Sequence, residues 1–208
     1  MRKPRLTAVI TAVATAAALA AGSAGASAAV LQGGPGVAHA SAAGHCLSSG
    51  VCINVTTLGA KHFIDVTGTP GNDNIQFKTI TAFGNNSLPH LGVNGFDTGI
   101  DEFDDTFITV NGVAGNDTIS LAGLNTVPFT RFGVNPKVYT KATLRSGRGN
   151  STLIAANSAS DTNVLIAGPG QNVLLARNGR VDTVEGAGHD TAQVDKTDHV
   201  TGVTKFLP

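Results

Sequence analysis

Two nine-residue segments of the chain combine glycine-rich turns with an aspartate, and this combination could hold a metal ion. Residues 68–76 read GTPGNDNIQ, and residues 112–120 read GVAGNDTIS. Glycines let the backbone turn through positive φ, so that carbonyl oxygens can converge, and the aspartate adds a hard carboxylate. A cage of oxygen ligands is what Ca²⁺ requires. The two segments therefore predict calcium chemistry at turns that lead into short aliphatic strands.

Three weaker copies of the same pattern follow in the second half of the chain. They are SGRGNSTLI from Ser146, AGPGQNVLL from Ala167 and EGAGHDTAQ from Glu185. Gly-Asn-Asp alone is an ordinary turn sequence, but five copies in one register, each followed by aliphatic residues, indicate a repeat. The sixth position of the five copies is occupied, in chain order, by Asp73, Asp117, Ser151, Asn172 and Asp190.

This nonapeptide resembles the repeat of the hemolysin-type (RTX) calcium-binding family, and the chain is similar to a degenerate, secreted bacterial member. The resemblance implies stacked coils, with calcium between successive turns on sixth-position carboxylates and turn carbonyls. It implies that Asn172 is a weaker neutral ligand and that Ser151 is not a ligand. Because two of the five copies lack the carboxylate, we expect fewer and weaker sites than in a full array. The implied carboxylate ligands are Asp73, Asp117 and Asp190, and the implied turn glycines are Gly71, Gly115 and Gly188.

Aspartates between the weaker copies suggest a second column of polar residues. The sixth positions and these aspartates form one series along the chain: Ser151, Asp161, Asn172, Asp182, Asp190 and Asp198. The steps of 10, 11, 10, 8 and 8 residues scatter around the nine residues of one half-turn in the resembled family. Alternate members should therefore stack on the same edge. Further candidate ligands on the second edge are Asp161, Asp182 and Asp198, whose loops lack the glycine pattern.

The strand pattern predicts an all-β fold, and the resemblance implies a parallel β-solenoid (β-roll or β-helix), with an N-terminal β-hairpin as its cap. INVTTLG and KHFIDVTG are two β-runs separated by a turn near Gly59, and a solenoid needs such a cap at its exposed end. Residues 79–100 break the register and are interpreted as a loop excursion, while 137–144 could form a strand. Ordinary β-sandwich strands stay open as an alternative. Each repeat has an aliphatic residue shortly after its sixth position, and we expect these residues to face inward and stack as a ladder: Ile75, Ile119, Leu153, Val173 and Ala192.

The N-terminal residues are typical of an export signal. Arg2, Lys3 and Arg5 precede an alanine-rich apolar core, and residues 26–28 form an A-x-A cleavage site. We therefore expect a signal peptide at 1–28, a flexible linker at 29–45 and one domain at 46–208, in a secreted extracellular protein, with cell-wall association left open. Without the three basic signal residues, 11 Lys and Arg face 14 Asp and Glu, a balance of about −3 that does not suggest nucleic-acid binding. No later stretch is apolar enough to span a bilayer.

The two cysteines, Cys46 and Cys52, lie six residues apart. In an exported protein we expect them to form a disulfide that closes a small loop. The spacing excludes a CxxC redox motif, and a zinc site would need a fourth ligand and a reducing compartment.

Two charged segments offer other chemistry. Asp101, Glu102, Asp104 and Asp105 could hold another calcium ion or act on glycans, although a solvated loop explains them as well. No nucleophile elbow, P-loop or metalloprotease motif is present, so we predict a binding protein, not an enzyme. A polysaccharide-active β-helix enzyme and a cell-wall-binding module are the alternatives. A cell-wall polyanion or polysaccharide could bind the basic cluster of Arg131, Lys137, Lys141, Arg145 and Arg148.

Overall fold

The computed structural model describes residues 40–80, 89–101, 105–124, 141–156 and 162–208. In these ranges the protein is all-β, and no helix is present. The fourteen strands form one mixed sheet. Their bounds are β1 Ala40–Cys46, β2 Cys52–Leu58, β3 Lys61–Thr67, β4 Asn74–Ile80, β5 His90–Val93, β6 Phe96–Asp101, β7 Asp105–Asn111, β8 Thr118–Gly123, β9 Lys141–Arg145, β10 Thr152–Ile154, β11 Thr162–Ile166, β12 Val173–Leu175, β13 Thr183–Gln193 and β14 His199–Phe206.

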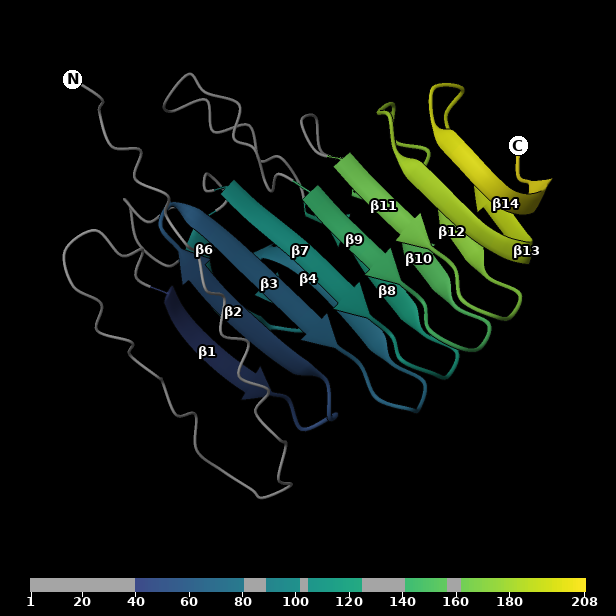
Figure 1. Cartoon of the computed structure of the whole chain (residues 1–208). Helices are drawn as coiled ribbons and strands as arrows, with labels where there is room; N and C mark the ends of the chain where they lie inside the picture. The colour runs from purple at the N-terminus through teal and green to yellow at the C-terminus, as the bar shows by residue number, and fades with distance from the viewer. Residues whose placement is uncertain (1–39, 81–88, 102–104, 125–140, 157–161) are drawn as a thin grey trace, which may run out of the picture.

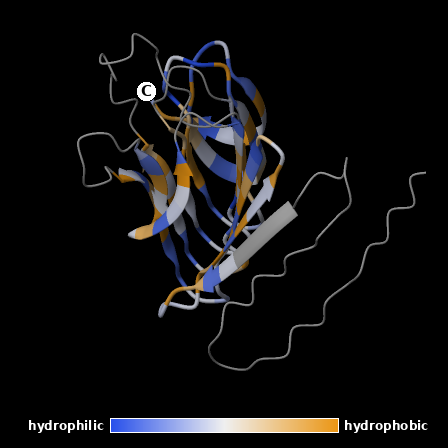
Figure 2. Ribbon diagram, turned by 90° about the vertical axis from the view of Figure 1, so that its left-hand side faces the viewer, coloured by the Kyte–Doolittle hydropathy of each residue, from blue (hydrophilic) through white to orange (hydrophobic). Residues whose placement is uncertain are grey.

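The sheet folds over into two layers of parallel strands (Figure 1). In the first layer β3, β7, β9, β11 and the start of β13 pair in parallel. In the second layer β4, β8, β10, β12 and the end of β13 do the same. The chain thus alternates between layers, and β13 passes from one layer to the other. Figure 2, turned by 90°, shows the two layers facing each other.

Antiparallel hairpins lie at the N-terminal end of the stack. β1 pairs with β2, and β2 with β3, both antiparallel, so the two β-runs expected on either side of Gly59 are confirmed. β1 begins at Ala40, inside the segment 29–45 that we expected to be a linker. In the second layer β5 and β6 extend the sheet from β4 as an antiparallel pair. The expectation of a loop at 79–100 was therefore wrong for 79–80, which end β4, and for 90–100, where Asn94 and Gly95, both at positive φ, close a hairpin turn.

The core lies between the layers, and each strand from β2 to β13 contributes one or two buried apolar side chains to it. Strand alternation sends Ile64, Ile108 and Leu144 inward from the first layer, and Ile75 and Ile119 inward from the second; all are fully buried. The predicted aliphatic ladder needs one correction. Leu174, not Val173, pairs in register with Leu153 and is buried, while Val173 pairs with Thr152 on the outer side.

Candidate functional site

The sixth-position residues of the five repeats gather at one edge of the stack, which we call the repeat edge. It consists of the turns 68–73, 112–117, 146–151, 167–172 and 185–190, each leading from the first layer to the second. Every sixth-position side chain is buried, and the most exposed of them, Asp73, has a relative exposure of 8 %. The sequence therefore located these side chains correctly in one column: Asp73, Asp117, Ser151, Asn172 and Asp190.

These side chains form a hydrogen-bond ladder between successive turns. Asp117 Oδ1 accepts the N–H of Asp73 at 2.9 Å, and Ser151 Oγ accepts the N–H of Asp117 at 3.0 Å. The series continues, because Asn172 Oδ1 accepts from Ser151 N–H at 2.9 Å and Asp190 Oδ1 from Asn172 N–H at 2.7 Å. Each polar group thus satisfies the buried amide of the turn before it. This explains why aspartate, asparagine and serine can all occupy the position.

A second ladder at the fifth position runs in the opposite sense, and our sequence reasoning missed it. Asn72 Oδ1 accepts the N–H of Asn116 at 2.7 Å, and Asn116 Oδ1 accepts the N–H of Asn150 at 2.8 Å. Asn150 Oδ1 in turn accepts the N–H of Gln171 at 2.8 Å. The signal was present in the sequence, since three successive repeats have asparagine directly before the sixth position.

The sixth-position side chains differ in how their second polar atom is bonded. Asp73 Oδ2 accepts the N–H of Thr69 at 2.6 Å, and Asp190 Oδ2 accepts the N–H of Ala187. The amide of Asn172 donates to the Gly168 carbonyl at 2.9 Å and to Asp190 Oδ1 at 2.9 Å. Among the described residues Asp117 Oδ2 is the one buried carboxylate oxygen with no hydrogen-bond partner.

Asp117 Oδ2 lies in a buried environment beside Gly112. Asp117 has a relative exposure of 1 %, and burial raises the pKa of its carboxyl; the Asp73 N–H lowers it, and the charge of Asp73 raises it. A Cβ placed on Gly112 would lie 2.3 Å from Asp117 Oδ2 and 2.6 Å from the Ser146 carbonyl oxygen. Glycine at this position therefore lets Asp117 Oδ2 and the Ser146 carbonyl oxygen lie close against the backbone.

The fourth-position glycines have a structural explanation independent of any ligand. A Cβ on Gly115 would lie 2.2 Å from the Gly71 carbonyl oxygen, and one on Gly149 would lie 2.0 Å from that of Gly115. Successive turns therefore stack backbone against backbone at this position. Gly188, in the last repeat, has positive φ but nothing within 4 Å of such a Cβ.

Two members of the predicted second column, Asp182 and Asp198, lie at the opposite edge, and both of their carboxylates are fully bonded. Asp182 is buried, and its Oδ1 accepts the Asn163 N–H at 2.9 Å while its Oδ2 accepts the Asn178 amide at 2.7 Å. Burial raises the pKa of Asp182, despite these bonds that lower it. Asp198 Oδ1 accepts the N–H of Asp182 and its Oδ2 that of Asp195. Asp161 lies outside the described residues.

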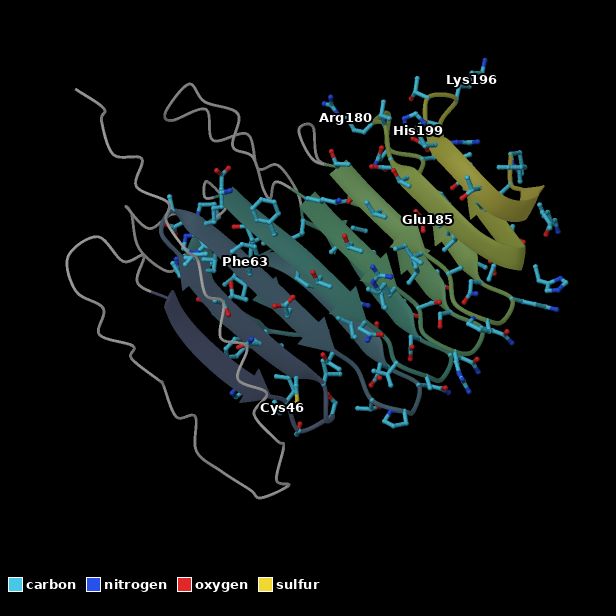
Figure 3. The ribbon with its side chains drawn as sticks, viewed as in Figure 1. Cys46, Phe63, Arg180, Glu185, Lys196 and His199 are labelled. Atoms are coloured by element: carbon cyan, nitrogen blue, oxygen red, sulfur yellow. A yellow bond between two sulfur atoms is a disulfide. The ribbon has the colours of Figure 1, made fainter. Side chains whose placement is uncertain are left out.

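The other predicted features have mixed outcomes. Cys46 and Cys52 form the expected disulfide at the start of β2 (Figure 3). Asp101 contacts His90 Nε2 at 3.2 Å in the β5–β6 hairpin. Within the described ranges, no three histidine, cysteine, aspartate or glutamate side chains lie together as a metal-binding group, and no helix has the length and apolarity to cross a membrane. Residues outside the described ranges include Glu102, Asp104, Arg131 and Lys137.

No protein-family model matches the chain, and comparison with curated proteins and with solved structures finds no similar protein.

Proposed function

We propose that the chain is a secreted, calcium-binding repeat protein of structural or surface-interaction type, built as an RTX-like parallel β-solenoid. The two layers of parallel strands support this proposal. Consecutive repeats occupy consecutive rungs of the second layer, and the strand between two repeats occupies a rung of the first. Two strands and two turns then make one coil, as in the resembled repeat family.

The observation that carries the calcium proposal is the unbonded oxygen of Asp117. A buried carboxylate oxygen without a partner costs free energy, of the order of 1–3 kcal/mol for a polar group. A divalent cation between Asp117 Oδ2 and the Ser146 carbonyl would remove that cost and also reduce the repulsion from Asp73. Both oxygens lie close to Gly112, which has no side chain to displace them.

The proposed site is a single weak one. Two protein oxygens are far fewer than the six to eight that Ca²⁺ takes, so water must supply the others and affinity in the range of about 10⁻⁴–10⁻³ M is expected. At the next rungs Ser151 and Asn172 replace the carboxylate, and hydrogen bonds satisfy these turns without a cation. The remaining aspartates serve the fold in the same way.

Calcium titration of the chelator-treated protein tests this function. We expect the thermal midpoint to rise saturably with calcium, since a ligand that binds only the folded state stabilises it. Magnesium should be less effective, because it demands a tighter octahedral site. Far-UV circular dichroism should show β-structure before calcium is added, because the ladders do not depend on it. Midpoints that do not respond to millimolar calcium would contradict the proposal.

Export is part of the same proposal. The signal-like N-terminus and the Cys46–Cys52 disulfide support it. Terminal sequencing of protein recovered from the culture medium would test it, with cleavage expected after residue 28.

A cell-wall polyanion is a second candidate ligand. Lys141, Arg145 and Arg148 are exposed, the first two at the ends of β9 and the third in the turn that follows. Salt-sensitive retention on purified cell wall would support this candidate. Retention that Lys141→Glu and Arg145→Glu leave unchanged would contradict it.

A further inference from the structure

Three strands have one edge without a hydrogen-bonded neighbour among the described residues. β1 pairs only with β2 and β6 only with β5, and both lie at the N-terminal end of the stack. β14 pairs only with β13 and lies at the other end (Figure 1). A free strand edge presents main-chain N–H and C=O groups that can pair with another chain. The molecule thus has pairing groups at both ends.

The directions of these strands are compatible with one another. Two antiparallel steps restore the direction of a strand, so β1 runs parallel to β3, and β6 runs parallel to β4. β14 is parallel to β13 in both layers, since His199–Thr201 pairs with its first residues and Lys205–Phe206 with its last. A second copy moved along the stack would therefore place its β1 and β6 beside β14 in parallel orientation. The parallel ladders of both layers would continue across the junction.

The side chains at the two ends are complementary in charge. The second-layer part of β14 carries Lys205 and no carboxylate, whereas β6, at the other end of the same layer, carries Asp97 and Asp101 and no cation. Lys205 pairs in register with Thr191 on the outer side of the second layer, and Asp97 is likewise exposed on the outer side of β6. The labelled side chains Lys196 and His199 extend from the same C-terminal end (Figure 3). Opposite charges would thus meet on the same outer surface.

The apolar side chains follow the same arrangement. Phe206 pairs in register with the buried Ala192, so it occupies an inward-facing position, yet 57 % of it is exposed because no described strand lies beyond β14. On β6 the buried Ile100 and the half-buried Phe96 face the core side of the sheet. A second copy joined at β14 would bring its Phe96 and Ile100 close to Phe206, on the core side of the sheet.

We propose that a second copy of this chain binds head to tail, with β14 of one molecule pairing along β6 and β1 of the next. Such a contact joins two different surfaces, so each added copy leaves both kinds of end available and the assembly grows as an open line. The partner is defined by its chemistry: an acidic edge strand on a parallel stack.

Sedimentation velocity of the purified, disulfide-bonded chain tests this proposal. The experiment is run in EGTA, so that its result is independent of the calcium proposal. We expect the average mass to rise with protein concentration and to fall with added salt, because exposed ion pairs are screened. Lys205→Glu should weaken association about tenfold, since it replaces an attraction by a repulsion.

Further variants distinguish this specific contact from non-specific aggregation. Asp101→Lys should weaken association, and combining it with Lys205→Glu should restore it. Lys141→Glu is the matched control, because both edges of β9 are already paired, and it should leave association unchanged. Phe206→Ser should also weaken association. Because Phe206 is largely exposed, this variant should fold, and it tests the contact even if Asp101→Lys does not fold. A monomer at all concentrations, or association unaffected by Lys205→Glu and Phe206→Ser, would overturn the proposal.

Discussion

Asp117 and Asn172 occupy equivalent positions in the turns of the repeat edge and accept the same kind of hydrogen bond. Each receives the N–H of the preceding turn on Oδ1. Their second atoms differ, because the amide of Asn172 donates to the Gly168 carbonyl, whereas Asp117 Oδ2 has no partner. Both polar atoms of the Asn172 side chain are therefore bonded, whereas one oxygen of Asp117 is not. At the scale of single residues, this unbonded oxygen distinguishes the Asp117 turn from the Asn172 turn.

Asp117→Asn should stabilise the calcium-free protein and abolish its response to calcium. The neutral amide removes a buried charge and can donate as Asn172 does, so we expect a gain of about 1 kcal/mol in the free energy of unfolding. Urea denaturation in EGTA measures it. Asp190→Asn is the control, since Asp190 Oδ2 already accepts the Ala187 N–H, and this variant should lose stability. Equal effects of the two substitutions would contradict the assignment of the site to Asp117.

The difference in stability between Asp117→Asn and the unsubstituted protein should depend on pH. Burial raises the pKa of Asp117 above its ordinary value of 3.8 in the folded chain. The folded state then binds a proton more readily than the unfolded state, so this group favours folding at acid pH and loses that contribution as pH rises through the raised pKa. The advantage of Asp117→Asn in EGTA should therefore be largest near neutral pH and shrink toward about pH 4. A pH-independent difference in urea midpoints would exclude a raised pKa.

The elements of this protein are short, and their stability depends on stacking. β10 and β12 have three residues each, too few to be stable alone, and each is paired in parallel on both sides. Coils can approach closely because the fourth-position glycines allow the turns to lie backbone to backbone. At the scale of elements, the pairing of these short strands therefore depends on the glycines in the turns.

Gly149→Ala tests the close approach of the turns. The added Cβ would lie 2.0 Å from the Gly115 carbonyl at a φ of +124°, so both a clash and backbone strain are expected, together about 3 kcal/mol or more. Gly188→Ala has the same repeat position and positive φ but no atom within 4 Å, so only about 1 kcal/mol is expected. Thermal unfolding of both variants measures the difference. Similar losses would show that strain alone, without stacking, requires the glycines.

At the scale of the whole molecule, the two ends of the stack are built differently. The N-terminal end has antiparallel hairpins on both layers, and the His45 and Phe96 rings stack across it at 4.5 Å. At the C-terminal end β14 is the last described strand, with Phe206 largely exposed. Because each coil contacts only its neighbours, stability should decrease from the middle of the stack toward this end.

Hydrogen exchange should reveal this gradient. Amides of β1, β6 and β14 pair on one side only. We expect those of β14 to exchange fastest, because the Cys46–Cys52 disulfide and the stacked rings of His45 and Phe96 hold the other two strands, and those of β9 and β10 to exchange slowest. The measurement is made at low protein concentration and high salt, where head-to-tail contacts are weakened. Uniform protection of all strands would indicate that the stack unfolds as a single unit, contrary to this prediction.

The sequence by itself determined the repeat, the column of sixth-position side chains and the disulfide, because all three follow from local spacing. A glycine-rich turn with a fixed nine-residue frame places Asp73, Asp117 and Asp190 at equivalent points, whatever the rest of the chain does. The all-β class followed in the same way from alternating strands. Val173 was misassigned within the frame, whose eighth position counted from Ala167 is Leu174, and one step along a strand reverses the face of the side chain.

Only the tertiary structure decided which aspartates are satisfied. The Oδ1 atoms accept from neighbouring turns 16 to 44 residues away in sequence, whereas Asp190 Oδ2 accepts the Ala187 N–H of its own turn. In the Asp117 turn the Val113 N–H donates to Asn111 Oδ1 instead, and the shared sequence pattern of the two turns does not reveal this difference in backbone path. The same is true of the β5–β6 hairpin, whose weak strand pattern is supported by pairing with β4. Burial and contact between neighbouring strands are non-local, and they determine which polar groups lack a partner and which strand edges are unpaired among the described residues.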